Sequence, residues 1–520
     1  MKRTRNTRIP LSPVDTAWLR MEDPTNLMMI TGVFLFDQPL DFETIKLVIE
    51  RKMLRFRRFR QRVIQPRLSF LPRYWIDDPS FDIDAHLHRI ALPAPGDQST
   101  LEELVNDFMS MPLDYSKPLW QFHLVENFGE GCALLCRLHH CIADGIALMR
   151  VLLSLTDDQP DEWHEEDLGI ATSSAIHDKD NIPLKVGRTH MPRNSRHKWL
   201  QKSLRMLTDP PRTAEAMKLG IDSSIALAHL LLLSPDPVTP YKGKLGVMKR
   251  CSWSQPIALK DVKAVGRVTG GTINDVLLAA VSGALGRYLR TRGEPTGGLD
   301  FRAVIPVNLR PPEEPLNLGN AFGLVFLSLP VGIDDPLDRL LELKNRMNSI
   351  KGTPEAIVAF GILNAIGVAP AEIEDVVVNL FGTKATTVIT NVPGPKEIRY
   401  FAGQPIKGLM FWVPQSGRLG LGVSILSYAG EVLVGMATDA GLVPDPESLV
   451  EAFHTEFDDL MDLVRMAREA DAEVEGSLVS DGQCQGQTRS GRRCKNRTSG
   501  ENRYCRIHDP QLKDEPALID

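Results

Sequence analysis

The chain has 520 residues, of which 43% are hydrophobic and 24% charged, and its formal net charge is -6. This balance is typical of a globular protein of two or more domains, and the mild acidity argues against nucleic-acid binding. Residues 1–10 lack the apolar core of a secretory signal, and the apolar run 225–233 is far shorter than the roughly 20 residues that cross a bilayer. We therefore expect a cytoplasmic protein that is soluble or peripheral on a membrane.

Strands and helices alternate in the first part of the chain. Residues 29–36 are partly β-branched or aromatic and predict a strand. Residues 41–54 have apolar side chains at helical spacing, and Asp41 is a typical helix N-cap. We expect further elements in chain order: a helix at 101–109, strands at 120–125 and 132–138, and a helix at 146–155.

The composition changes between residues 156 and 241. Asp, Glu, His, Pro and Ser dominate first, and a basic stretch follows. Such a long segment indicates a crossover between two halves of a fold. We predict four regions: an N-terminal half at 1–156, a crossover at 157–241, a C-terminal half at 242–470 and a tail at 471–520.

Three segments have two interpretations each. The basic clusters 51–62 and 185–205 suit anionic lipid headgroups or the phosphates of a ligand. They equally suit a solvated helix face and a flexible linker, as charge runs often do. The apolar patch 225–233 either packs as a helix or touches a membrane.

The second half resumes a regular alternation. A strong helix at 272–290 is followed by strands at 302–308 and 322–329 and by mostly helical sequence at 336–350 and 354–381. Mixed strands and helices in two comparable halves predict an α/β protein in which two sandwiches face each other. The remaining expected elements are strands at 385–391, 421–427 and 432–438 and a closing amphipathic helix at 446–469.

One motif carries the chemistry. Residues 138–146 read LHHCIADGI, so a strand ends, His139 and His140 follow, and Asp144 and Gly145 lead into a helix. A histidine at a strand end, with a reference pKa near ~6.5, is neutral enough to accept a proton at cytoplasmic pH. Asp144 either accepts the other ring N–H or ties the turn to a distant arginine. Gly145 permits a backbone angle that other residues resist, which lets the loop turn sharply.

The bare HxxxD pattern is weakly specific. A second copy, His454 and Asp458, falls inside the closing helix, where an i,i+4 pair on a surface helix is the simpler interpretation. The doubled histidine, the following glycine and the strand–turn–helix context distinguish the first copy.

The motif HHCIADG resembles the HHxxxDG signature of the coenzyme A-dependent acyltransferase superfamily. The likeness narrows to one family and runs from about residue 8 to about residue 466, with the order of its motifs intact. The stretches that resemble the bacterial wax ester synthase/diacylglycerol acyltransferase family are LSPVDTAWLR at 11–20, Pro118-Leu119-Trp120, Asn274-Asp275 within TINDVLLAA, and NVPGP at 391–395.

The resemblance implies roles for these residues. It implies two chloramphenicol-acetyltransferase-like halves with a substrate tunnel between them and His140 as the base. His139 would support His140, Asp144 would be mainly structural, and Asn274 would lie near the active site. The residues expected to shape the substrate site are Gly145, Pro118, Leu119, Trp120 and Asp275.

The other stretches that resemble the family can also be explained by local structure alone. Residues 118–120 form an apolar turn before a strand, which is more often core than site. Asn274 would cap a helix, with Thr272 as a rival cap. Residues 391–395 would form a turn.

The implied function is transfer of a long-chain fatty acyl group from coenzyme A to diacylglycerol or to a long-chain alcohol. No cofactor is expected for catalysis, and peripheral association with a membrane or lipid droplet is expected. Two alternatives stay open: a condensation-type acyltransferase that takes acyl chains from a carrier protein, and a non-catalytic scaffold whose tail binds nucleic acid or protein.

The tail departs from the family. Cys484, Cys494, Cys505 and His508 have the spacing C-x9-C-x10-C-x2-H in a polar, basic stretch. Three thiols and an imidazole make a tetrahedral zinc set, and so short a segment needs a metal to fold. The sequence therefore predicts a structural zinc site, and the alternative is a disordered tail with incidental cysteines.

Overall fold

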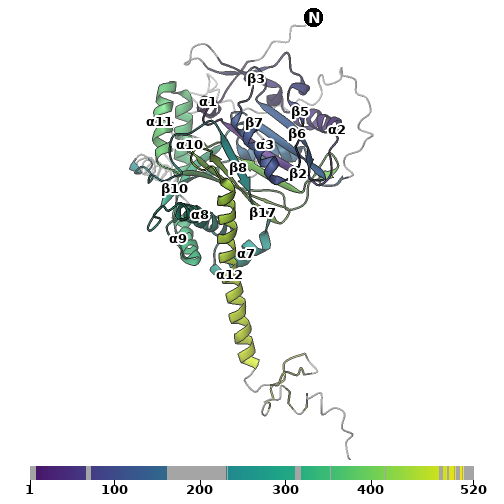
Figure 1. The fold of residues 1–520 in the computed structure, drawn as a ribbon, viewed down its shortest axis with the longest axis vertical. Helices are drawn as coiled ribbons and strands as arrows, with labels where there is room; N and C mark the ends of the chain where they lie inside the picture. Colours follow the sequence, from purple (N-terminus) through teal and green to yellow (C-terminus); the bar gives the residue numbers. More distant parts are fainter. Residues whose placement is uncertain are drawn as a thin grey trace, which may run out of the picture.

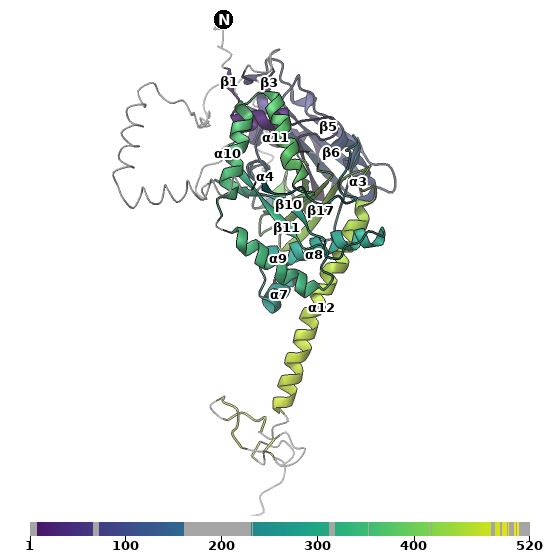
Figure 2. The same cartoon turned by 90° about the vertical axis from the view of Figure 1, so that its left-hand side faces the viewer.

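Figures 1 and 2 show the computed structural model of the chain in two views. Helices surround two large β-sheets, and one long helix projects from this body. The structure describes residues 8–65, 72–160, 230, 232–310, 318–351, 353–415, 417, 419–479, 484–488, 491–496, 498, 504–505 and 507–508.

The first sheet has five strands, mostly from the first half of the chain. In order across the sheet they are β15 (Gly408–Trp412), β2 (Met29–Phe36), β7 (Gly131–His139), β6 (Trp120–Phe128) and β5 (Leu87–Ala91). The pairs are antiparallel except for β5 with β6. All nine residues of β7 are buried, as expected for a central strand covered on both faces.

Four helices and a small sheet accompany this first sheet. The helices are α1 (Pro13–Arg20), α2 (Phe42–Val48), α3 (Gln98–Ser110) and α4 (Gly145–Ser154). Asp41 caps α2 as predicted, and the helix continues as a π-helical turn at Ile49–Met53. Short 3-10 helices lie at Arg57–Arg60 and Ile83–Ala85, and the small sheet contains β1 (Ile9–Pro10), β4 (Tyr74–Asp77) and β3 (Gln61–Ile64).

The second sheet has seven strands, all from the later part of the chain. Its main path is β11 (Phe322–Leu329), β10 (Phe301–Asn308), β12 (Thr387–Pro393), β16 (Leu421–Tyr428), β17 (Glu431–Asp439) and β8 (Lys249–Trp253), and β9 (Ile257–Ala258) pairs with β17. The central strand β12 is parallel to β10 and to β16, and the other pairs are antiparallel. The sheet is therefore mixed.

The two sheets are joined through β15, which follows β12 in sequence but pairs with β2. A short hairpin of β13 (Tyr400–Phe401) and β14 (Gln404–Pro405) precedes it. A shared core cluster holds Val33 and Leu135 of the first sheet with Trp253 and Leu433 of the second. The fold class predicted from the sequence, two α/β halves facing each other, is confirmed.

The helices of the second half pack around its sheet, and α10 also packs against α1 of the first half. They are α7 (Leu259–Thr269), α8 (Ile273–Thr291), α9 (Pro336–Ile350), α10 (Glu355–Val368), α11 (Ala371–Thr383) and α12 (Pro446–Val479). The rod-like α12 packs against α8 near its start and then leaves the body (Figures 1 and 2).

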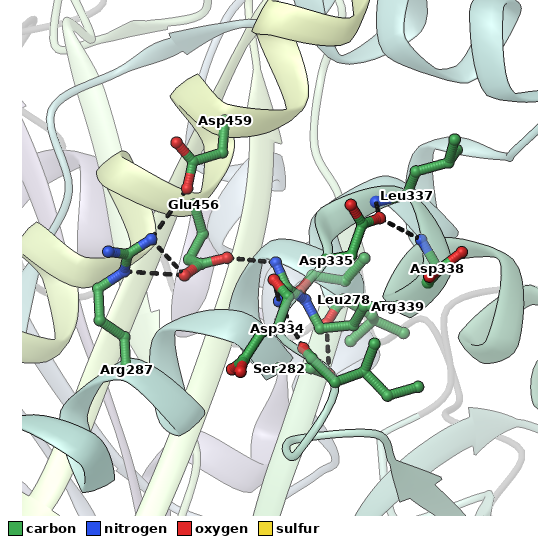
Figure 3. Close-up of polar contacts among 12 residues, drawn as sticks. Leu278, Ser282, Arg287, Asp334, Asp335, Leu337, Asp338, Arg339, Glu456 and Asp459 are labelled. Atoms are coloured by element: carbon green, nitrogen blue, oxygen red, sulfur yellow. Dashed lines mark hydrogen bonds and ion pairs between the residues drawn. The ribbon is translucent and has the colours of Figure 1, made fainter. Parts of the chain in front are cut away.

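A buried ion-pair cluster fastens α12 to α8 and α9 (Figure 3). Glu456 of α12 pairs with Arg339 of α9, and its other oxygen lies 2.7 Å from Arg287 Nη2 of α8. Glu456 and Arg339 are almost fully buried, whereas Asp459, a second partner of Arg287, is largely exposed. Arg339 Nε also donates to the Ala279 carbonyl at 3.0 Å, so the buried cation is well satisfied.

The predicted elements agree with the structure within a few residues, with three informative differences. The helical sequence at 354–381 is two helices, because Pro370 has no N–H and restricts the residue before it. Residues 391–393 of the NVPGP segment belong to β12 and not to a turn. The closing helix α12 extends ten residues beyond the predicted end at 469.

Some predictions concern residues that the structure does not describe. The basic stretch 185–205 and most of the crossover 157–241 lie outside the described residues. Within the apolar patch 225–233, Leu230 is buried and Leu232 is exposed. In the other basic cluster, Arg57 pairs with Asp77 and Arg58 is buried over the Trp75 ring, so part of this cluster has internal partners.

Among the described helices, none is by itself both long and apolar enough to cross a bilayer, and α7 with α8 meets that test only as a pair bent by 95°.

The ion-pair cluster generates a stability prediction. Glu456→Ala leaves the buried Arg339 guanidinium without its carboxylate, and we expect unfolding to become easier by about 3–5 kcal/mol. Asp459→Ala removes only an exposed partner of Arg287 and should cost about 0–1 kcal/mol. Urea denaturation of both variants measures the difference. Equal losses of unfolding free energy in the two variants would contradict the expectation that the buried ion pair is the stronger one.

Candidate active site

The histidine pair lies where β7 ends and the chain turns toward α4. His139 N donates to the Leu119 carbonyl at 3.0 Å, and His140 N donates to the Met28 carbonyl at 2.7 Å. Both histidines are buried, with exposures of 0% and 4%. The sheet therefore holds the backbone of the pair from two sides, so the imidazoles have fixed positions.

His139 has a partner at each ring nitrogen. Its Nδ1 accepts the Cys141 N–H at 3.0 Å, so Nε2 must carry the hydrogen in the neutral ring. That nitrogen lies 2.9 Å from Glu22 Oε2, and the Tyr115 hydroxyl donates to Glu22 Oε1 at 2.8 Å. Burial alone would raise the pKa of Glu22, but the bonds and charge from His139 and the Tyr115 bond outweigh it and lower this pKa. His139 is thus an anchored ring with a partner at both nitrogens.

His140 has a different environment. Its ring stacks on Trp18 of α1, with centroids 4.1 Å apart, and Phe322 of β11 lies nearby. Burial lowers the pKa of His140 to about 4, and the Asp144 charge offsets this only in part. The imidazole is therefore neutral at physiological pH, the state in which it can accept a proton.

Asp144 ties the two halves together. One carboxylate oxygen accepts the Ala147 N–H at 2.9 Å and caps α4. The other accepts the Ala321 N–H at 2.9 Å and lies 2.5 Å from Arg310 Nη1. Of the two possibilities considered from the sequence, the bond to a distant arginine is present. Asn320 adds a neighbouring contact, because its Nδ2 donates to the His140 carbonyl at 2.9 Å.

The backbone at Gly145 does not have the unusual angle expected from the sequence. Its φ is not positive, and it begins α4 in ordinary helical geometry. A Cβ built there meets no atom within 4 Å. Gly145 therefore leaves open space at the start of the helix that follows the histidine pair.

The Asn274-Asp275 pair lies in the first turn of α8. Thr272 is the N-cap, in a capping box with Asp275, so of the two caps considered from the sequence it is Thr272 that begins the helix. Asn274 is exposed, and its Oδ1 accepts from Asn391 Nδ2 at 2.8 Å. The structure brings His139, His140 and Asp144 together, but among the described residues no hydrogen bond joins Asn274 to them.

Residues 118–120 lie in the core and contact the backbone of the histidine pair. Leu119 and Trp120 are fully buried, and Leu119 provides the carbonyl that binds His139 N. Trp120 Nε1 donates to the Phe59 carbonyl at 2.8 Å, and its ring stacks on His86. These contacts belong to packing, which is the local explanation considered for this segment.

An apolar cavity lies beside His140. Only apolar residues line it, and Trp18 forms part of its wall. Trp18 also stacks on His140, so this one side chain contacts both the cavity and the imidazole, although His140 itself does not line the cavity. The other walls come from the sheet, α10 and α11, with Val304, Leu324, Ala359, Ile366 and Phe381 among the lining residues.

Four functional candidates were not singled out as site residues from the sequence: Glu22, Tyr115, Trp18 and Arg310. Each contacts the motif from a distant position in the chain, so spacing along the sequence carries no signal for them. Trp18 does fall in the stretch 11–20 that carries part of the family resemblance.

The tail brings its four predicted ligands together. One ligand atom each of Cys484, Cys494, Cys505 and His508 lies within 4.8 Å of the others. The Sγ atoms of Cys494 and Cys505 are 3.9 Å apart, too far for a disulfide and close to the ligand separation of about 3.8 Å expected in a tetrahedral thiolate site. Backbone N–H groups of Gly486 and Cys505 donate to Cys484 Sγ and hold this sulfur in place. This cluster is able to hold a metal ion.

Solved structures share this architecture. The wax ester synthase/diacylglycerol acyltransferase from Marinobacter aquaeolei VT8 aligns with a TM-score of 0.63 at 23% identity and covers 88% of this chain and 99% of that one. The first condensation domain of the calcium-dependent antibiotic synthetase aligns with a TM-score of 0.55 at 14% identity, over 88% of this chain and 96% of that one. The fold is thus the two-domain fold shared by condensation domains and these acyltransferases.

Sequence comparison identifies one family among the proteins that share this fold. The wax ester synthase/diacylglycerol acyltransferase catalytic domain matches residues 11–277, and the C-terminal domain of the same family matches residues 318–461. The chain belongs to the wax ester synthase/diacylglycerol acyltransferase family. A probable diacylglycerol O-acyltransferase of Mycobacterium tuberculosis is 29% identical over 448 residues, which cover 84% of this chain and 93% of that protein.

The His139 anchor generates a prediction. Glu22→Ala removes the carboxylate that binds both the buried His139 N–H and the Tyr115 hydroxyl, and it should lower the free energy of unfolding by about 1–3 kcal/mol. Glu130→Ala, at an exposed position, should stay within about 0.5 kcal/mol of wild type. Urea denaturation measures both variants. An unchanged free energy of unfolding in Glu22→Ala would mean that the His139 ring does not depend on this carboxylate.

Proposed function

We propose that the protein transfers a long-chain fatty acyl group from acyl-coenzyme A to the hydroxyl of diacylglycerol or of a long-chain alcohol. The observation that carries this proposal is the buried, neutral His140 next to an apolar cavity in a chain of this family. The relatives support the acceptors, because their names specify diacylglycerol O-acyltransferases and a wax ester synthase.

The reaction needs a base and a polarising environment. His140 removes the hydroxyl proton as the oxygen attacks the thioester carbonyl, and the tetrahedral intermediate then expels the coenzyme A thiolate. The imidazolium returns the proton to that thiolate, so the imidazole ends the cycle unchanged. This route requires no covalent acyl-enzyme.

The developing oxyanion needs hydrogen-bond donors. Asn274 is one candidate, because the bond from Asn391 occupies its amide oxygen and leaves the Nδ2 hydrogens to serve as donors. Backbone N–H groups are the other candidate. Gly145 would help substrate approach, since no side chain fills the space over the start of α4.

We infer that the protein acts in the cytoplasm at the periphery of a membrane or lipid inclusion. Its proposed acceptors partition into lipid, and the buried, unpaired thiols Cys132, Cys136, Cys141 and Cys251 suit a reducing compartment.

A zinc ion is the metal that we propose for the tail cluster. A closed set of three thiolates and one imidazole is the ligand composition of structural zinc sites. The ion would hold together a segment with few apolar residues, and it would take no part in acyl transfer.

The base is tested by His140→Ala. Activity with palmitoyl-coenzyme A and either diacylglycerol or hexadecanol should fall by about 10²–10⁴-fold. Circular dichroism should confirm that the variant is folded, and His454→Ala, at a half-buried position of α12, supplies a matched control that keeps activity. An H140A enzyme within a few-fold of wild type would refute the role of His140.

The pKa of His140 predicts the acid limb of the pH profile. Because its pKa is lowered to about 4, the ring stays neutral as the pH falls through the ordinary histidine range. We expect kcat/KM to be nearly constant from about pH 8 to about pH 5 and to fall as the pH approaches the folded-state pKa. A decline centred near about pH 6.5, in protein that is still folded, would contradict this.

The tail is tested by elemental analysis. We expect one zinc per chain in the full-length protein and none after truncation beyond residue 475, with acyl transfer largely retained. Cys494→Ser should lose the metal, whereas Cys251→Ser, at a buried thiol of the body, should keep it. Metal-free full-length protein would overturn the zinc assignment.

A further inference from the structure

The outer face of α10 is apolar, although it is exposed. Ile357, Gly361, Ala365 and Val368 recur at helical spacing, and all four are exposed, Val368 to 74%. The inner face of the same helix is also apolar, because it packs on α1 and β11. A helix that is hydrophobic on all sides normally has another apolar phase around it.

The neighbouring helix α11 continues this surface. Its exposed residues Ile373, Val376 and Leu380 also recur at helical spacing, and Val376 is 67% exposed. Two acidic side chains of these helices point inward: Glu374 pairs with Arg20 of α1, and Glu355 is buried and accepts the Phe326 N–H. The side chains of Glu372 and Asp375 lie outside the described residues. In both views α10 and α11 lie together on one flank of the body (Figures 1 and 2).

The inner faces of these two helices line the apolar cavity. Ile362 and Ile366 of α10 and Val378 of α11 line it, and Trp18, which stacks on His140, forms part of the same wall. The two helices therefore border the apolar cavity on one side and carry the exposed apolar face on the other. This arrangement favours a lipid as the occupant, because acyl chains suit both the exposed face and the apolar cavity behind it.

We propose that the outer face of α10 and α11 docks on a phospholipid bilayer, from which the acceptor lipid enters the cavity. The entry step rests on the proposed function, and the docking step does not. This docking depends on apolar contacts, so it differs from the electrostatic attachment that basic clusters would give. It should occur on zwitterionic lipid and should change little with salt, since screening acts on charges.

Flotation of the full-length protein with phosphatidylcholine vesicles containing diacylglycerol tests the docking. The double variant Ile357→Glu/Val376→Glu places one charge on each helix, and neither position lines the cavity. We expect its vesicle binding to weaken by at least about tenfold at low and high salt. The matched control is Val268→Glu/Met466→Glu, which adds the same charges at exposed apolar positions on α7 and α12 and should bind as wild type.

Loss of binding in both double variants, or in neither, would overturn the proposal. If the glutamate pair fails to fold, Ile357→Ser/Val376→Ser removes apolar area without adding charge, and unchanged binding by that folded variant would also overturn it. Sedimentation without lipid is a further test, because a stable dimer lost in the same variants would assign the face to a second copy of the chain.

Acyl transfer separates docking from the proposed function. The glutamate pair should lose activity on diacylglycerol in vesicles but keep it on a short, water-soluble alcohol with a short-chain acyl-coenzyme A. Equal loss on both acceptors would overturn the entry step. Wild-type protein that binds vesicles but transfers no acyl group to either acceptor would refute the proposed function and leave the docking result intact.

Discussion

The Asp144 carboxylate is the constraint on which the arrangement of the site depends. It caps α4 on the side of the first sheet and binds Arg310 and the Ala321 N–H beyond β10 of the second sheet. These bonds connect the two halves of the fold, which come from different parts of the sequence. Because β11 supplies Phe322 beside His140, displacement of one half would also change the surroundings of the imidazole.

Two adjacent histidines have opposite electrostatic environments. The Cys141 N–H and Glu22 occupy both nitrogens of His139, which fixes its tautomer and its orientation. His140 instead lies between aromatic rings, where burial disfavours the cation. The pair thus separates two tasks, since one ring is part of the scaffold and the other keeps a reactive lone pair.

The sequence predicts the fold well because local signals agree with the global arrangement. Asp41 and the regular spacing behind it place α2, and the apolar run before His139 places the buried β7. The local sequence does not decide where two neighbouring residues are similarly good helix caps. Both Thr272 and Asn274 can cap a helix, and the capping box with Asp275 decides for Thr272.

The site is predicted less completely than the fold. The motif places His139, His140 and Asp144 together, but the partners that define their roles come from far along the chain. Arg310 is one such partner, and no periodicity points to it. The sequence of α10 likewise has no polar face, so its pattern cannot distinguish a buried helix from one that is apolar and exposed. The roles of the site residues and the bounds of the four predicted regions stay predictions.

The length of α12 has a consequence for the tail. Packing of its residues against the body ends near Val464, but the helix continues to Val479, so about 20 Å of it extends beyond the body. A flexible linker would let the Cys/His cluster explore a sphere around the enzyme. The helix instead carries the start of the tail away from the body, so the length of α12 sets how far Val479 lies from the enzyme (Figures 1 and 2).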